Sequence, residues 1–342
     1  YSTTSEIWYP CEDYEVLSID TKSTELVGLS ATSIKELPNL IVERNLTPSD
    51  TIVVTHGSWR FPTKWGYKLS TLGYKWVYLP HGMLEPWSLR KHRIKKFIYF
   101  SMFEKPMARE AAIVGGTSTP EFKNLKKHFS EVQFTPSGID PTKCLELPKK
   151  STDPIRFLFL GRLHKKKGIM PLVEGWKASG LYCDSQFALS IVGYDDGEER
   201  KLSKFLDNCK DPTTNIEYLG PMYGEQKDNL LMRCTYYVLP SFSEGFATSV
   251  LDAIKFGVIP IISKGCNFPE AISENFAIPI APSVTDVMRT LNSLRDYSLE
   301  RRIAMALRAK TFFKANYSTE TIAKAQNSRH KALLDNVKDN RS

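Results

Sequence analysis

Short runs of apolar residues recur along the chain at a spacing that predicts buried strands. Four runs lie in the first part of the sequence and five in the second, at residues 51–57, 75–82, 111–117, 131–138, 155–162, 187–193, 215–220, 235–241 and 258–263. Continuous apolar runs of this length are typical of strands buried on both faces of a sheet. Segments with helical periodicity separate them, and this alternation predicts parallel sheets covered by helices.

A polar stretch with two prolines, LELPKKSTDP (Leu145–Pro154), divides the two series of runs. Such a composition is typical of a linker between domains. We therefore predict an α/β protein of two Rossmann-like, doubly wound parallel-sheet domains that face a central cleft. The first comprises residues 1–148, joined by the C-terminal helical segment 319–342, and the second comprises residues 149–318. Because ligands bind beyond the carboxyl ends of parallel strands, the cleft is the expected active site.

The composition agrees with a globular chain of two domains. Of the 342 residues, 42% are hydrophobic and 25% are charged. No apolar run is long enough to span a bilayer, and no pattern of a signal peptide precedes the first strand. The six cysteines are scattered without a Cys-x-x-Cys pair, which favours reduced thiols over a zinc site or a disulfide framework. We expect a cytoplasmic protein.

The net charge of +8 is concentrated in one region of the chain. Residues 60–110 hold eleven Lys and Arg side chains against three Glu. A basic patch of this kind favours an anionic partner. Within it, residues 87–109 combine basic and aromatic positions and predict a peripheral contact with an anionic membrane surface. The alternative is a helix with one core face and one solvated basic face. No nucleic-acid recognition module is visible, so nucleic acid is not an expected partner.

The stretch GRLHKKKG (Gly161–Gly168) follows a predicted strand and carries four cations. A guanidinium and several ammonium groups at a strand-to-helix turn suit a phosphate or diphosphate, although a solvated basic turn is the alternative. The chain contains neither a G-x-x-x-x-G-K-[ST] loop nor a G-x-G-x-x-G fingerprint. By contrast, the adjacent acids Asp195 and Asp196 are interpreted as a surface turn.

Two acids frame the stretch SEGFATSVLDAIKFG (Ser243–Gly257). The residues after Glu244 are expected to begin a helix, whose free N–H groups favour an anion. Glu244 itself would oppose a bare phosphate but suits sugar hydroxyls. Asp252, about two turns further on, is placed to hold a vicinal diol, as an acid holds ribose in dinucleotide sites. The alternative is a capping Glu244 and a solvated Asp252.

This stretch, in its context PSFSEGFATSVLDAIKFGVIP, resembles the signature of the retaining glycosyltransferases of family 4, group 1 enzymes of bacterial surface-polysaccharide synthesis that share the GT-B fold. The family pattern Glu-x7-Glu is Glu244 and Asp252 here, with an acid one methylene shorter. GRLHKKKG is similar to the diphosphate-binding Arg and Lys of the family, and TPSGID (Thr135–Asp140) to its Pro-Asn-Gly-Val-Asp. THGSW, PHGMLEPWSLR and LGPMYGEQKDNLLMRC also fit, so that the resemblance covers residues 51–275.

The resemblance implies roles for individual residues. Arg162 and Lys167 would hold the diphosphate and stabilise it as the leaving group. Glu244 would contact hydroxyls of the donor sugar, and His81 would face the same sugar. Together these four form the expected catalytic set. Asp252 would take the ribose, and Met222 would line the base pocket. The expected donor-binding set is Gly245, Phe246, Ala247, Thr248, Ser249, Asp252, Met222 and Gly138.

The function that the resemblance implies is a retaining transfer of sugar from a nucleotide-diphosphate sugar to a growing glycan, here a lipid-linked surface polysaccharide at the inner face of the plasma membrane. No cofactor is expected. The absence of Asp-x-Asp argues against the metal-dependent GT-A class. Two alternatives stay open: a catalytically weak or dead nucleotide-sugar-binding protein, motivated by the shorter acid at Asp252, and a GT-B nucleotide-sugar epimerase. The sugar, base, acceptor and linkage are not encoded in these motifs.

Overall fold

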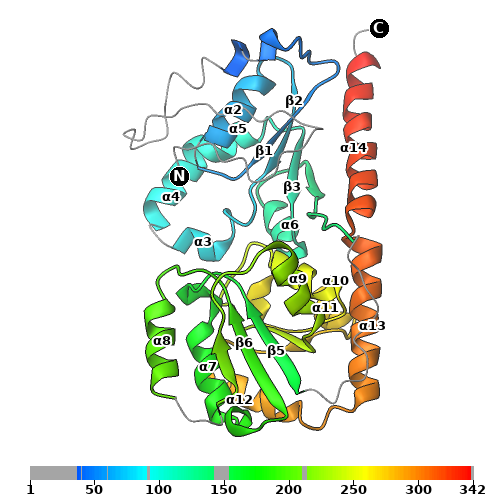
Figure 1. The fold of residues 1–342 in the computed structure, drawn as a ribbon. Helices are drawn as coiled ribbons and strands as arrows, with labels where there is room; N and C mark the ends of the chain where they lie inside the picture. The colour runs from blue at the N-terminus through cyan, green and yellow to red at the C-terminus, as the bar shows by residue number, and fades with distance from the viewer. Residues whose placement is uncertain are drawn as a thin grey trace.

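The computed structural model describes residues 37–39, 41–59, 61–90, 93–141, 154–209 and 214–339. They form two parallel-sheet domains, which lie one above the other in Figure 1. The fold class predicted from the apolar runs is therefore confirmed. The predicted linker lies outside the described residues except for Pro154.

The N-terminal domain is built on a four-stranded parallel sheet with the strand order β1-β2-β3-β4. Its strands are β1 (Ile52–His56), β2 (Lys75–Leu79), β3 (Ile113–Gly116) and β4 (Val132–Phe134). The helical elements around them are α2 (Phe61–Ser70), α3 (Pro86–Arg90), α4 (Arg93–Tyr99), the π-helix η1 (Phe100–Glu104), α5 (Lys105–Ala108) and α6 (Thr119–Leu125). All four strands coincide with predicted apolar runs. The turn after β2 lies against Gly245 of the C-terminal domain.

The C-terminal domain contains a six-stranded parallel sheet with the strand order β10-β9-β8-β5-β6-β7. Its strands are β5 (Ile155–Leu160), β6 (Phe187–Val192), β7 (Ile216–Tyr218), β8 (Tyr236–Leu239), β9 (Ile259–Ile262) and β10 (Ile278–Pro279). Five of these were predicted; β10 was not, because two residues give no periodicity to detect. The strand order reverses between β5 and β8, and such a reversal opens a crevice beyond the carboxyl ends of the two strands.

Helices cover both faces of this sheet (Figure 1). The α-helices are α7 (Ile169–Ala178), α8 (Glu199–Asp207), α9 (Gly224–Met232), α10 (Thr248–Lys255), α11 (Glu270–Ser273), α12 (Val284–Ser293) and α13 (Leu299–Asn316). Short 3-10 turns are η2 (Lys165–Lys167), η3 (Leu181–Cys183) and η4 (Lys264–Cys266). Of these, η2 and α10 follow the two strands at the reversal point and therefore border the predicted crevice.

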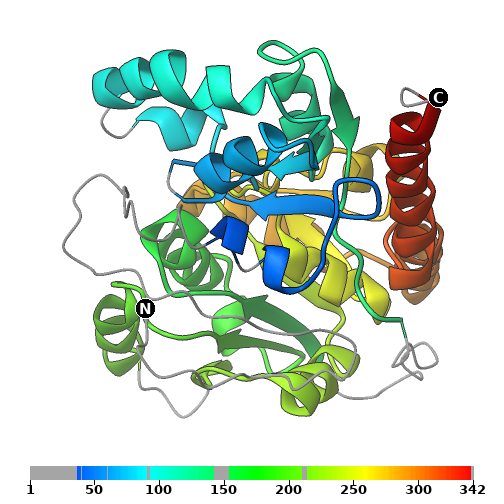
Figure 2. The same ribbon diagram turned by 90° about the horizontal axis from the view of Figure 1, so that it is seen from above.

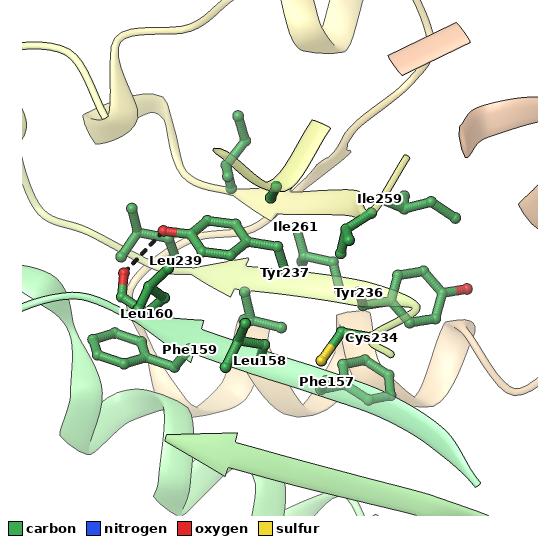
Figure 3. Close-up of a cluster of buried hydrophobic side chains, with 14 of the residues drawn as sticks. Phe157, Leu158, Phe159, Leu160, Cys234, Tyr236, Tyr237, Leu239, Ile259 and Ile261 are labelled. Atoms are coloured by element: carbon green, nitrogen blue, oxygen red, sulfur yellow. Dashed lines mark hydrogen bonds between the residues drawn. The ribbon is translucent and has the colours of Figure 1, made fainter. Parts of the chain in front are cut away.

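Large apolar side chains of β5, β8 and β9 fill the core beneath this crevice (Figure 3). Phe157, Phe159 and Tyr236 are at most 1% exposed. Tyr237 is also fully buried, and its hydroxyl donates a hydrogen bond of 3.2 Å to the carbonyl oxygen of Leu160. Burial of apolar surface on this scale is the main stabilising contribution to the domain. It fixes the strand ends from which the polar loops emerge.

The last helix, α14 (Thr319–Asp339), continues from α13 after Tyr317 and Ser318 and runs beside the N-terminal sheet (Figures 1 and 2). Leu333 packs against the buried cluster of Val77, Leu79 and Ile113. Arg329 donates a hydrogen bond of 2.7 Å to the carbonyl oxygen of Phe134, at the end of β4. Helix α14 thus packs against the four-stranded sheet of the N-terminal domain.

Replacing Leu333 with alanine is expected to lower the free energy of unfolding by about 1–2 kcal/mol, because the half-buried side chain completes a small apolar cluster. Thermal and urea unfolding would measure the change. The control is Lys331→Ala, at an exposed position of the same helix, which we expect to stay within about 0.5 kcal/mol of the parent. Equal stabilities of the two variants would contradict this account of α14.

Candidate active site

The loops after β5 and β8 are joined at the point where the strand order reverses. The amide of Phe242 donates a hydrogen bond of 2.8 Å to the carbonyl oxygen of Lys166. Gly168 closes the turn after η2 with φ +71°, and a Cβ there would lie less than 3.0 Å from the carbonyl oxygen of Pro240. A side chain would collide with backbone, so the close approach of the loops requires glycine at this position.

Glu244 is held in place from several directions. Lys167 Nζ lies 2.9 Å from its carboxylate, and the side chains of the pair are only 13% and 12% exposed. The hydroxyl of Ser241 donates a second hydrogen bond to the same carboxylate. Asn267 Nδ2 donates to the carbonyl oxygens of Glu244 and Gly245, at 2.7 and 3.0 Å. Side chain and backbone of Glu244 are therefore both oriented before any substrate arrives.

Lys167 and Lys166 lie beside this carboxylate, and Arg162 lies close to Lys166. Burial lowers the pKa of Lys166, Glu244 opposes that effect, and the charges of Lys167 and Arg162 add to it. Arg162 Nη1 also lies 2.7 Å from Asp196, with half of the arginine side chain exposed. Because a guanidinium has five N–H donors, this contact does not exhaust its capacity to bind an anion.

The turn Asp195–Asp196 is a surface turn, as predicted, but its two acids differ. Asp195 Oδ1 accepts hydrogen bonds from the amides of Gly197, Glu198 and Glu199 at the start of α8, and these bonds hold the pKa of Asp195 below its ordinary value. Asp196 instead pairs with Arg162. The contact of Asp196 with the basic loop was not foreseen from the sequence.

Helix α10 begins at Thr248, and Ala247 before it provides no capping side chain. The hydroxyl of Ser249 shares a hydrogen bond of 2.6 Å with the buried hydroxyl of Tyr237, so it is directed at the sheet. The backbone N–H groups of this turn are consequently the groups suited to an anion. Phe246 is half-buried, and its ring stacks on Tyr317 with centroids 5.7 Å apart.

Asp252, on the second turn of α10, forms an ion pair with Lys227 of α9. The distance from Lys227 Nζ to Asp252 Oδ2 is 2.9 Å, and the side chains are 25% and 21% exposed. Burial raises the pKa of the Tyr237 hydroxyl well above its ordinary value, and the charges of Glu244 and Asp252 raise it further.

The N-terminal domain reaches this site through its His81–Gly82 turn. A Cβ on Gly82, which has φ +72°, would lie less than 3.0 Å from the Cα of Gly245. The amide of Gly82 donates a 2.5 Å hydrogen bond to the buried carboxylate of Glu121. Ser118 Oγ donates to the carbonyl oxygen of Gly245 at 3.4 Å, and Thr119 Oγ1 to the carboxylate of Glu270. The two domains meet at the first residue after Glu244.

His81 pairs with a second histidine at the end of the neighbouring strand. His56 Nδ1 and His81 Nε2 are 2.7 Å apart, and the rings stack with an interplanar angle of 14°. Burial lowers the pKa of both imidazoles, and the charge of His56 lowers that of His81 further. Burial thus favours the neutral form of both rings, and in the contact between their nitrogens one donates and the other accepts.

Gly138 and Met222, two further residues of the predicted donor-binding set, have the following surroundings. Gly138 lies against the first turn of α14, where a Cβ would be 3.0 Å from the Cα of Thr319 and 3.2 Å from Cβ of Ile322. Met222 is half-buried and packs against the core of the C-terminal domain.

Two residues of the site were not predicted: Asp196 and Lys227. Asp196 lies in the loop after β6, and such a position is a signal that the sequence does contain; His56, the last residue of β1, carries the same signal. Lys227 lies within a helix and carries no such signal. Across the described ranges, no group of three His, Cys, Asp or Glu side chains is arranged to hold a metal ion, and no helix is long and apolar enough to cross a membrane.

Comparison with known proteins shows which family the C-terminal domain is similar to. Residues 146–310, which include Arg162, Lys167, Glu244 and Asp252, match the family described as Glycosyl transferases group 1. O-antigen chain mannosyltransferase B of Escherichia coli is 28% identical over 170 residues, covering 48% of this chain and 44% of that protein. The phosphatidylinositol N-acetylglucosaminyltransferase subunit of Arabidopsis thaliana is 22% identical over 264 residues, covering 74% and 56%. The chain thus spans about half the length of these curated relatives.

Solved structures show the same fold. WaaG, a glycosyltransferase involved in lipopolysaccharide biosynthesis, superposes with a TM-score of 0.69 at 16% identity over 93% of this chain and 87% of that one. Sucrose-phosphate synthase of Thermosynechococcus elongatus has a TM-score of 0.69 at 17% identity, over 90% and 80%. Residues 146–310 therefore match a glycosyltransferase group 1 domain, and the two domains of the chain have the GT-B fold that its sequence motifs predict.

Proposed function

We propose that this protein transfers a sugar from a nucleotide-diphosphate sugar to a hydroxyl of a growing glycan, with retention at the anomeric carbon. The observation that carries the proposal is the Lys167–Glu244 pair at the reversal point of the sheet, directly beside the His81–Gly82 turn of the other domain. Lys167, a cation for the leaving group, and Glu244, an acid for the sugar, lie on the C-terminal domain, and His81 lies on the N-terminal domain opposite them. This arrangement suits a donor bound between the domains.

The donor diphosphate would be bound by Arg162, Lys167 and the N-terminus of α10. Negative charge develops on the diphosphate as the glycosidic bond breaks, and fixed cations stabilise that charge more than they stabilise the ground state. Lys167, one-eighth exposed and already oriented by Glu244, needs little reorganisation for this role. In the proposed reaction these protein cations stabilise the leaving group, and neither a metal ion nor a cofactor takes part.

The sugar would lie between Glu244 and His81. Glu244 accepts hydrogen bonds from sugar hydroxyls, and the neutral His81 exchanges one with a hydroxyl on the opposite side. In the proposed reaction the bond from the anomeric carbon to the phosphate oxygen breaks, and its electron pair stays on that oxygen. The acceptor oxygen bonds to the same face of the carbon, and its proton passes to the leaving phosphate.

The acceptor is proposed to be a surface polysaccharide, assembled on a lipid at the inner face of the plasma membrane. The matched E. coli relative is named as an O-antigen mannosyltransferase, and the Erwinia amylovora relative AmsK as an amylovoran glycosyltransferase. Because another relative is named as a phosphatidylinositol N-acetylglucosaminyltransferase subunit, a phosphatidylinositol acceptor is the alternative.

A surface of the N-terminal domain supports contact with such a membrane. On α4 and η1, Ile94, Phe97 and Met102 are 78%, 68% and 64% exposed. Arg93 and Lys95 are exposed on the same helix. This segment projects on the side of the molecule opposite α14 (Figures 1 and 2). Apolar side chains flanked by cations suit the interface of a bilayer that contains anionic lipids.

Removing the cations or the acid of the site is expected to reduce turnover. We expect Arg162→Ala, Lys167→Ala and Glu244→Gln each to lower kcat by about 10²–10³-fold, because each removes a group fixed against the donor. Nucleotide release from a panel of UDP-, GDP- and ADP-sugars, with lipid-linked acceptors, would measure it. Lys165→Ala is the control, since Lys165 is an exposed cation of the same turn.

The same assay separates the alternatives. A donor that binds but is never cleaved with any acceptor would indicate a sugar-nucleotide-binding protein. Conversion of one nucleotide sugar into its epimer without an acceptor would indicate an epimerase. Release of nucleotide that all three site variants retain would contradict the assignment of the site.

Activity is expected to fall as the pH drops below 6.5. The pKa of His56 and of His81 lies below the ordinary value of 6.5, so the folded chain protonates these imidazoles less readily than the unfolded chain. The free energy of unfolding therefore also decreases as the pH falls below 6.5. Burial, and after it the charge of Glu121, raises the pKa of nearby Glu85 to about 7. The contribution of Glu85 to the free energy of unfolding therefore has the opposite sign and decreases as the pH rises towards 7.

The test is the pH profile of kcat/KM for the parent, His56→Gln, His81→Gln and Glu85→Gln. We expect the acidic limb to flatten in the two histidine variants and to persist in Glu85→Gln. An acidic limb that is unchanged in both histidine variants would show that another group titrates.

Membrane binding is expected to require the exposed apolar side chains. We expect the double variant Ile94→Ser/Phe97→Ser to lower, several-fold, the fraction of protein that sediments with vesicles containing phosphatidylglycerol. Neither side chain is buried, so folding should be unaffected. Leu307→Ser, at a residue 47% exposed on α13, is the matched control. Equal sedimentation of the double variant and the control would overturn this proposed surface.

A further inference from the structure

Glu121 is a buried acid to which the proposed reaction assigns no role. It lies on the first turn of α6 and is only 1% exposed. The amide of Gly82 and the amide and hydroxyl of Thr117, all uncharged groups, donate hydrogen bonds to its carboxylate. Burial of a carboxylate costs free energy that hydrogen bonds from neutral groups only partly offset. What Glu121 holds therefore explains its place better than a contribution to stability does.

Helix capping accounts for only part of these contacts. Ser118 is the N-cap of α6, and its hydroxyl accepts a hydrogen bond of 3.3 Å from the amide of Glu121. In a Ser-x-x-Glu pattern the glutamate commonly reaches back to the amide of the cap residue. Here Oε2 accepts from the amide and the hydroxyl of Thr117, at 2.8 and 2.7 Å. Oε1 instead accepts from the amide of Gly82, on the turn after β2.

This last contact fixes the peptide group between His81 and Gly82. Both residues have a left-handed backbone, with φ of +51° and +72°. The conformation is unfavourable for histidine and persists only where the surrounding structure determines it. The amide of Gly82 belongs to the same planar peptide group as the carbonyl of His81. Holding that amide therefore restricts the backbone of His81 and the direction of its imidazole.

The same end of α6 rests on the C-terminal domain. Ser118 Oγ donates a hydrogen bond of 3.4 Å to the carbonyl oxygen of Gly245. Thr119 Oγ1 donates another to the carboxylate of Glu270. The first turn of α6 thus connects the His81–Gly82 turn with the domain on which the donor is proposed to bind.

We propose that Glu121 is a positioning residue for the sugar transfer: it holds the His81–Gly82 turn so that the imidazole of His81 stays directed at the donor sugar. The inference rests on the proposed function. Glu121 touches no substrate and acts on the chemical step through His81. Because Arg162 and Lys167 of the other domain would hold the diphosphate, Glu121 does not affect binding of the nucleotide.

The main variant is Glu121→Gln, which keeps the shape of the side chain but turns one acceptor into an NH2 group that opposes another donor. We expect kcat for nucleotide release to fall about 10–100-fold, because a small misplacement of a group at the reacting centre is costly. The Kd of the nucleoside diphosphate of the same donor, measured by calorimetry, should change less than about twofold, since the loss is confined to the transition state.

A second comparison is made in the His81→Gln background, at an enzyme concentration that makes its residual turnover measurable. There Glu121→Gln should change kcat by less than about twofold, since the effects of residues that act through one another are not additive. A merely structural role of Glu121 would cost the same factor in both backgrounds.

Trp76→Phe is the matched control for lost stability. Trp76 is fully buried at the second position of β2, and its Nε1 donates a hydrogen bond of 2.8 Å to Thr55 Oγ1. Removing this bond should lower the temperature of unfolding, as Glu121→Gln does, and leave kcat within about twofold of the parent. Thermal unfolding of both variants checks that their stabilities are comparable.

The outcomes separate this inference from the function beneath it. If the parent releases nucleotide from no sugar donor, the proposed function fails and the inference fails with it. If the parent is active, three results would overturn the role of Glu121 while the function stands: an unchanged kcat in Glu121→Gln, an equal loss in the His81→Gln background, or an equal loss in Trp76→Phe. Weaker binding of the nucleoside diphosphate by Glu121→Gln would also overturn it, because the proposed role begins after binding.

Discussion

The contact between Gly82 and Gly245 is the constraint on which the arrangement of this site depends. Two backbones approach so closely that a methyl group on Gly82 would overlap Gly245, and Gly82 also has a positive φ. A contact without side chains allows the turn after β2 to touch the residue that follows Glu244. As a result, His81 of one domain and Glu244 of the other border the same space, and the hydrogen bond of Ser118 to Gly245 reinforces the contact.

Three ion pairs of the C-terminal domain join different elements near the site. Lys167 pairs with Glu244, Lys227 with Asp252, and Arg162 with Asp196. Pairing keeps several cations close together at tolerable cost, because each has a counter-charge within hydrogen-bonding distance. The N-terminal side differs, since burial lowers the pKa of its two histidines and favours their neutral form. A donor between the domains would thus meet fixed charges on one side and neutral hydrogen-bonding rings on the other.

The surrounding packing explains how such a site is kept in place. Tyr237 lies fully buried under the acids and is bound to both Ser249 and the carbonyl oxygen of Leu160, so that β5, β8 and α10 are linked beneath the site. On the outer side, Phe246 stacks on Tyr317, whose carbonyl oxygen accepts a hydrogen bond from the amide of Ile139. The junction of α13 and α14 therefore connects the loop after Glu244 with the N-terminal domain.

The sequence by itself determined the nine longer strands, the basic turn after β5 and the two acids after β8, because burial in a parallel sheet leaves continuous apolar runs and places polar residues at their ends. It did not determine which distant elements meet. The pairs Lys227–Asp252 and His56–His81, and the contact of Gly82 with Gly245, join residues on separate elements. Only the tertiary structure decided them, since they follow from the order of strands in each sheet and from the docking of two domains, and neither leaves a periodic signal in the local sequence.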